Sequence, residues 1–158
     1  MLHRVLECCS KPMTLVLGAN AKKIYNTLPS FPGEIIVHTE WAEGLSSSLC
    51  AALKNIPSNT AAILFVLGDQ PLITQRELKN LHNIWKNNTT RIVAAEYGEN
   101  IGAPCIFPCS YFTELQSLKG DRGAQALLKK YYSQVLRVTM NSASIDIDTP
   151  ADLYKVYI

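Results

Sequence analysis

The residues best placed to do chemistry are three aspartates. In the stretch LFVLGDQPLIT, residues 64–74, an apolar run leads through Gly68 directly into Asp69. A carboxylate at the end of a buried strand suits a hard cation such as Mg²⁺, which commonly takes only one or two protein carboxylates together with phosphate oxygens. Asp146 and Asp148 could supply the second carboxylate, because alternate residues of an extended segment lie on the same side. The structural alternatives are a turn residue at Asp69 and a helix start beside Asp148.

A second candidate site is the stretch GLSSS, which comprises Gly44, Leu45, Ser46, Ser47 and Ser48. Leu45, like Leu49 after it, belongs to an apolar stripe at helical spacing, which places the glycine and the serines at a helix entrance. Hydroxyls and free backbone N–H groups at such an entrance can hold a phosphate, a ribose or a base edge. Plain N-capping by one serine is the structural alternative.

The pattern of the chain predicts elements that would bring these stretches together. Strand-like runs lie at 14–17, 34–39, 61–67, 91–97, 105–107 and 134–140. Helical spacing lies at 21–28, 46–56, 75–86, 111–118, 123–132 and 150–157. This alternation predicts an α/β sandwich with a mostly parallel sheet. Ligands of such sheets bind at the carboxyl ends of the strands, where four loops would meet: 18–20, 39–48, 68–71 and 146–150.

One helix start is chemically explicit. Thr74 can cap the helix predicted at 75–86, while Glu77 reaches back to it in a capping box. Ile73 can pack against Leu78 as a hydrophobic staple. These residues fix where the loop that carries Asp69 ends.

The bulk properties narrow the class of protein. The 158 residues, 47% of them hydrophobic, predict one domain, and a net charge of +2 without a dense Lys/Arg run argues against a nucleic-acid partner. The longest apolar run, 61–67, is too short to span a membrane. Charged residues interrupt MLHRVLECCSKP, so no signal peptide is expected there and the predicted location is cytoplasmic. Five cysteines without a Cys-x-x-Cys pair favour reduced thiols over a metal site.

Six motifs occur in an order and spacing that resemble one family. They are LVLGAN, WAEGLSSSL, LFVLGDQPLIT, GAPCIF, LKGDRGAQALL and DIDTPADL. Together they resemble the molybdopterin cytidylyltransferase branch of the nucleotidyltransferases that are similar to molybdenum cofactor guanylyltransferase. The resemblance covers about residues 2–157.

The resemblance implies a fold and a reaction. The fold would be a three-layer α/β sandwich with a mostly parallel, Rossmann-like sheet of the nucleotide-diphospho-sugar transferase type. The reaction would transfer CMP from CTP to the molybdopterin cofactor and release pyrophosphate. Asp69 would hold the Mg²⁺ cofactor and Asp148 would be its partner, both in catalytic roles, with Asp146 as a further metal ligand.

The resemblance also implies binding residues for CTP and molybdopterin. The GLSSS loop would lie near the base and sugar, with Gly18 and Gly68 in neighbouring loops. The GAP and GDRGA motifs would border the pterin. The residues carried over from these two motifs are Gly102, Pro104, Asp121 and Arg122.

One departure from the family pattern is large. Members begin with a strand and a loop of the pattern G-G-x-S-x-R-M-G-x-x-K, which grips the triphosphate, and the chain contains no such pattern. We therefore expect an N-terminally truncated single domain over 1–158. Its first strand would be missing between the strands at 14–17 and 61–67, which leaves exposed strand edges there. We also expect transfer by this chain to be impaired. The alternatives are a transferase for another nucleotide such as GTP, or a non-catalytic protein that binds molybdopterin, a molybdoenzyme or its maturation chaperone.

Overall fold

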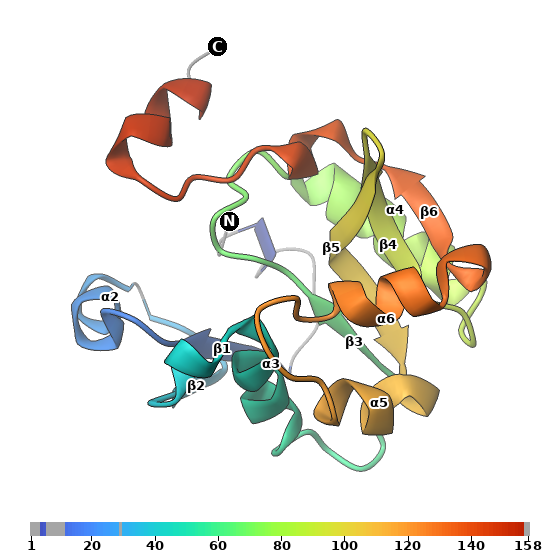
Figure 1. Cartoon of the computed structure of the whole chain (residues 1–158), viewed down its shortest axis with the longest axis horizontal. Coiled ribbons are helices and arrows are strands. Elements are labelled where there is room, and N and C mark those ends of the chain that lie inside the picture. Colours follow the sequence, from blue (N-terminus) through green and yellow to red (C-terminus); the bar gives the residue numbers. More distant parts are fainter. Residues whose placement is uncertain (1–3, 6–11, 29, 157–158) are drawn as a thin grey trace.

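The structure is a computed structural model that describes residues 4–5, 12–28 and 30–156. In these residues the strands form two sheets (Figure 1). The first sheet pairs β1 (Thr14–Leu17) with β2 (Glu34–Val37) in parallel. The second has the order β3-β5-β4-β6, with the bounds β3 Ala62–Phe65, β4 Val93–Tyr97, β5 Asn100–Pro108 and β6 Leu136–Thr139. The α-helices are α2 (Ala21–Thr27), α3 (Leu45–Leu53), α4 (Gln75–Lys86), α5 (Phe112–Gln116) and α6 (Gln125–Lys130).

Helices cover both faces of the second sheet and complete a three-layer sandwich (Figure 1). Neighbouring residues of one strand point to opposite faces. Accordingly, Ala94 and Phe107 lie in a core cluster with leucines of α3, α5 and α6, and Val93 and Ile106 lie in a second cluster with leucines of α4. The predicted α/β sandwich is confirmed.

The second sheet is mixed where the sequence predicted a mostly parallel one. β5 runs antiparallel to both β3 and β4, whereas β4 and β6 are parallel. Only residues 98–99 separate β4 from β5, and so short a connection can join only antiparallel strands. β5 also begins five residues before the predicted strand at 105–107, because the sheet accommodates Gly102 and Pro104 in an irregularity: Ala94 pairs with Cys105, but Ala95 pairs with Gly102.

The two sheets are separate in the residues that the structure describes. β1 and β3 each end a sheet, and none of the residues that the structure describes forms a strand between them. α3 connects the two parts: it packs on β1, and its residues Leu49 and Leu53 lie in the core cluster of the second sheet.

The predicted start of α4 is confirmed in detail. The Thr74 hydroxyl accepts from the Glu77 N–H at 3.2 Å, and the Glu77 carboxylate accepts from the Thr74 N–H at 2.7 Å. Ile73 and Leu78 are both buried beside this capping box. Burial opposes ionisation of Glu77, but the hydrogen bonds from Thr74 and Ser142 outweigh it and hold the pKa of the carboxyl below its ordinary value.

We expect Thr74→Ala to lower the free energy of unfolding by about 1 kcal/mol, because it leaves a backbone donor of α4 without its cap. Urea denaturation followed by circular dichroism measures the loss. Thr113→Ala is the control, since Thr113 lies exposed within α5 and should change stability by less than about 0.5 kcal/mol. An equal loss in both variants would contradict the capping role.

The helix predicted at 150–157 is a 3-10 helix, Pro150–Val156, and residue 157 lies outside the described residues. Leu153 and Tyr154 are 49% and 63% exposed, so few apolar contacts are present to stabilise an α-helix there. Among the residues described, no helix combines the length and the apolar character needed to cross a membrane.

Candidate functional site

Asp69 lies four residues beyond the end of β3, and the chain returns to it much later. The Ile147 N–H donates to the Asp69 carbonyl at 2.8 Å, which places Asp146 and Asp148 on either side of that contact. Burial raises the pKa of Asp69, and the carboxylates of Asp146 and Asp148 raise it further, whereas a backbone hydrogen bond opposes them. The structure thus brings together the three aspartates that the sequence singled out.

One oxygen of the Asp69 side chain lacks a hydrogen-bond partner. Its Oδ1 atom is buried and has no hydrogen-bond partner in the described structure. A buried carboxylate oxygen without a donor is costly, and two further carboxylates nearby increase the cost. A divalent cation would remove both penalties at once.

The loop that carries Asp69 is held by contacts of the residues that follow the aspartate. Gln70, which is 1% exposed, donates from Nε2 to the Ala143 carbonyl at 2.9 Å, and so joins the loop to the segment before Asp146. The Arg4 guanidinium donates to the carbonyls of Pro71 and, at 2.8 Å, Ile73. These contacts fix the backbone directly after the carboxylate. Sequence reasoning did not identify Gln70 or Arg4, because each acts across more than 60 residues of chain.

The donor set suits a Mg²⁺ ion that takes some of its ligands from water and substrate, rather than a metal ion that protein side chains enclose completely. Within the described ranges, no three His, Cys, Asp or Glu side chains are close enough to hold a metal by themselves. Mg²⁺ does not require such a set, since one or two carboxylates, waters and substrate phosphates complete its octahedron. Asp69 with Asp148 or Asp146 fits that requirement.

The GLSSS loop packs against a second loop that the sequence also singled out. Gly44 has φ of 102°, and a Cβ atom there would lie 2.4 Å from Asp121 Oδ1. The Ser46 N–H donates to the Gly120 carbonyl at 3.0 Å, and Leu45 packs against Gly123. The structure therefore places the predicted base-and-sugar loop beside the GDRGA motif, with Asp121 and the neighbouring Arg122 exposed.

The serines of this loop are not simple helix caps. Gly44 occupies the N-cap position of α3, and no side chain caps that helix. Ser46 is completely buried, and its hydroxyl has no partner in the described structure, whereas Ser48 is half-buried. N-capping of α3 by a serine, the structural alternative, is therefore not observed.

Ser47 contacts two backbone carbonyls and the His38 ring. Its hydroxyl donates to the Gly44 carbonyl at 2.8 Å and lies 3.1 Å from the Glu40 carbonyl. His38 Nε2 lies 2.9 Å from the same oxygen. The Ser47 hydroxyl thus lies between two backbone carbonyls and the His38 ring, which hold it at the start of α3.

The remaining predicted positions fall in three places. Gly18 lies against Trp41, where a Cβ atom would come within 2.7 Å of the Trp41 Cβ, so the loop at 18–20 meets the loop after β2. Gly102 and Pro104 lie in β5, and Pro104 is fully buried, so its own side chain can shape the strand but not touch a ligand. A Cβ atom on Gly68 would meet nothing within 4 Å, so the backbone before Asp69 is open to approach.

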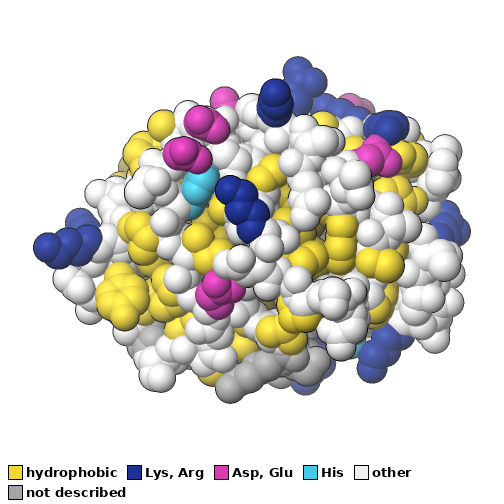
Figure 2. Space-filling model, turned by 90° about the horizontal axis from the view of Figure 1, so that it is seen from below, with side chains coloured by type: hydrophobic (Ala, Val, Ile, Leu, Met, Phe, Trp, Pro, Cys, Tyr) yellow, Lys and Arg dark blue, Asp and Glu magenta, His cyan; other side chains and the backbone are white. Residues whose placement is uncertain are grey.

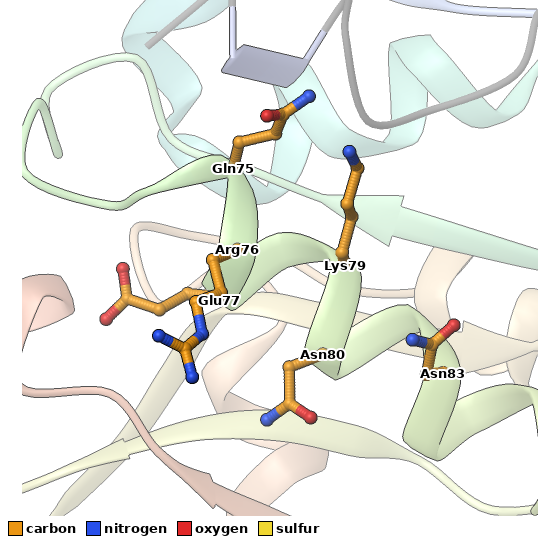
Figure 3. Close-up of a pocket in the computed structure, with 6 residues that line it drawn as sticks. All are labelled: Gln75, Arg76, Glu77, Lys79, Asn80 and Asn83. Carbon is orange, nitrogen blue, oxygen red and sulfur yellow. The ribbon is translucent and has the colours of Figure 1, made fainter.

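Two surface features lack the converging side chains of a binding site. A hollow of about 570 Å³ lies along the exposed side of α4, but its six lining residues all come from that one helix and fan out rather than converge (Figure 3). On the face shown in Figure 2, Lys and Arg side chains are dispersed among hydrophobic and acidic ones. That face has no basic patch of the kind that binds a phosphate backbone.

The cysteines that the structure describes are free thiols: Cys50, Cys105 and Cys109. Burial raises the pKa of the Cys105 thiol to about 12, which keeps it protonated. Cys8 and Cys9 lie outside the described residues.

Comparison with known proteins supports the assignment of the fold. Nicotine blue oxidoreductase from Paenarthrobacter nicotinovorans is 26% identical in an alignment of 155 residues that covers 91% of this chain and 74% of that protein. The crystal structure of Rv0371c from Mycobacterium tuberculosis H37Rv in complex with manganese matches with a TM-score of 0.82 at 23% identity, over 98% of this chain and 82% of that one.

A molybdenum-cofactor protein shares the same fold. Molybdopterin-guanine dinucleotide biosynthesis protein A from Archaeoglobus fulgidus matches with a TM-score of 0.63 at 16% identity, over 97% of this chain and 81% of that one. The family model of the MobA-like NTP transferase domain matches residues 1–135. With that match over most of its length, and with the predicted fold confirmed, the chain belongs to the MobA-like NTP transferase domain family.

Proposed function

We propose that the chain is a Mg²⁺-dependent nucleotidyltransferase that transfers CMP from CTP to the molybdopterin cofactor. The observation that carries the proposal is the buried, partnerless Oδ1 atom of Asp69 beside Asp146 and Asp148. This arrangement is what a site for a divalent cation requires, and such transfer chemistry depends on neutralising phosphate charge. The manganese complex of the mycobacterial relative supports a divalent metal.

The reaction assigns a role to each part of the site. A phosphate oxygen of molybdopterin forms a bond to the α-phosphorus of CTP, and the bond from that phosphorus to pyrophosphate breaks, with its electron pair leaving on pyrophosphate. Asp69 and Asp148 would hold Mg²⁺, with Asp146 as a further ligand, and the bound metal would neutralise the phosphates. The loop from Gly44 to Ser48 would lie along the base and sugar.

A second candidate function is non-catalytic binding of molybdopterin or of a molybdoenzyme or its chaperone. The observation that favours it is the separation of β1 from β3, each of which ends its sheet in the residues that the structure describes. The similarity to a protein named nicotine blue oxidoreductase also indicates that similar chains need not share one reaction. A transferase that uses GTP is the nearest alternative within the enzyme class.

Calorimetric titration of CTP and of GTP, each with Mg²⁺ and then with excess chelator, tests the proposal. We expect binding of CTP that requires Mg²⁺ and is tighter than binding of GTP, together with pyrophosphate release when molybdopterin is added. Tighter binding of GTP would contradict the choice of nucleotide. Binding of molybdopterin by a chain that binds neither nucleotide would establish the non-catalytic alternative.

A further inference from the structure

Tyr97 lies at the edge of the aspartate cluster and is not among the residues that the sequence pointed to. It is the last residue of β4 and is half-buried. Its ring packs against the core cluster beneath α4, so the phenol is held at a fixed place. Since Ala95 pairs with Gly102 and Tyr97 pairs with Asn100, Tyr97 and Gly102 are diagonal neighbours in the β4–β5 hairpin.

The hydroxyl of Tyr97 lies directly over Gly102. A Cβ atom on Gly102 would come within 2.4 Å of the Tyr97 oxygen and 3.3 Å of the ring carbon that bears it. Any other residue at position 102 would therefore displace the hydroxyl. The glycine of the GAP motif thus has a specific structural effect: it leaves the space that the phenol occupies.

The hydroxyl is also within electrostatic reach of the Asp146 carboxylate. Burial raises the pKa of Tyr97, and the Asp146 carboxylate raises it further. A tyrosine hydroxyl has an ordinary pKa of about 10, so it carries its proton at neutral pH and can donate a hydrogen bond.

A neutral donor at this place has a specific use. The acceptor phosphate must approach the α-phosphorus next to Asp69, Asp146 and Asp148, and these carboxylates repel it. A donor beside the carboxylates can bind a phosphate oxygen without adding negative charge, and a hydrogen bond to a charged oxygen is among the stronger ones.

We propose that Tyr97 contacts the acceptor substrate, its hydroxyl donating a hydrogen bond to the acceptor's phosphate from its place over Gly102. The inference rests on the proposed function, since it takes Asp69 to mark the reacting centre. It adds a residue that determines acceptor binding, whereas the loop from Gly44 to Ser48 serves the nucleotide.

Tyr97→Phe tests the inference, because it removes the hydroxyl and keeps the ring. We expect the affinity for molybdopterin, measured by quenching of its fluorescence, to fall about tenfold or more, with KM for molybdopterin rising in parallel and kcat changing less. Affinity for CTP with Mg²⁺ should stay within about twofold. Gly102→Ala should produce the same pattern by displacing the hydroxyl.

Tyr132→Phe is the matched control, since the Tyr132 hydroxyl bonds Arg137 on the exposed side of the sheet and should affect neither ligand. If the wild-type chain binds CTP and molybdopterin but Tyr97→Phe binds molybdopterin equally well, the inference about Tyr97 is overturned and the proposed function stands. A fall in CTP affinity instead would also overturn it. If the wild-type chain binds neither ligand, the proposed function fails first.

Discussion

Asp69→Asn is expected to reduce Mg²⁺-dependent transfer about a hundredfold or more while the protein stays folded. The amide keeps the size of the side chain but offers a neutral oxygen, which is a poor ligand for a hard cation. Loss of metal-based charge neutralisation is worth several kcal/mol in the transition state, which corresponds to that loss in rate. Pyrophosphate release measures the rate, and circular dichroism checks the fold.

The same substitution should maintain or increase stability at neutral pH without metal. The pKa of Asp69 is raised in the folded chain, so the folded state binds the proton more readily than the unfolded state does. The ionised carboxylate therefore lowers stability above the raised pKa, and the penalty disappears as the pH falls below the ordinary value for aspartate. Urea denaturation should show the variant's advantage at neutral pH and its loss in acid.

Glu43→Gln is the matched control for Asp69→Asn. Glu43 is an exposed carboxylate in the 3-10 helix Trp41–Glu43, and its replacement should leave both rate and stability unchanged. Retention of the wild-type rate by Asp69→Asn would rule out the metal assignment. Unfolding of the variant would show that the carboxylate serves the core.

Gly44→Ala is expected to lower the free energy of unfolding by about 2–4 kcal/mol, more than the loss of the Thr74 cap. Two causes combine: φ of 102° strains any residue with a side chain, and the added methyl would collide with Asp121 Oδ1 and the backbone of Gly120. The contact between the loops at 44–48 and 120–123 should loosen. CTP affinity should fall together with stability, because the proposed nucleotide loop is displaced.

Substitution of two other glycines distinguishes backbone strain from steric collision. Gly98 has φ of 57°, but a Cβ atom there would meet nothing within 4 Å, so Gly98→Ala should cost only about 1 kcal/mol from backbone strain. Gly68 has open space and no positive φ, so Gly68→Ala should leave stability nearly unchanged. A loss at Gly44 no larger than that at Gly98 would show that the two loops are not in tight contact.

Most of the fold could be predicted from local patterns. Most predicted strands and helical segments are present with small shifts, because apolar spacing and the Thr74–Glu77 capping box act over a few residues. β5 was the exception. Its Gly102 and Pro104 are poor strand formers, and the pairing with β4 compensates for them through an irregularity that no local pattern encodes.

The site was predictable where it depends on sheet topology. Asp69 and the segment from Asp146 to Asp148 meet because both lie where loops converge at one sheet edge. Gln70 and Tyr97 were missed, since their contacts with Ala143 and Gly102 arise only on folding. One signal could have identified Tyr97: it ends a strand directly before the Gly98 turn, close to the GAP motif.

Binding of Mn²⁺ is the measurement that tests the central claim most directly, since it asks whether the aspartate cluster holds a divalent cation. Mn²⁺ prefers oxygen ligands as Mg²⁺ does, and its electron paramagnetic resonance signal distinguishes free from bound ion. Titration of the wild-type chain with CTP present should reveal one site, which Asp69→Asn weakens at least tenfold and Glu43→Gln leaves intact. Equal Mn²⁺ affinity in wild type and Asp69→Asn would contradict the account.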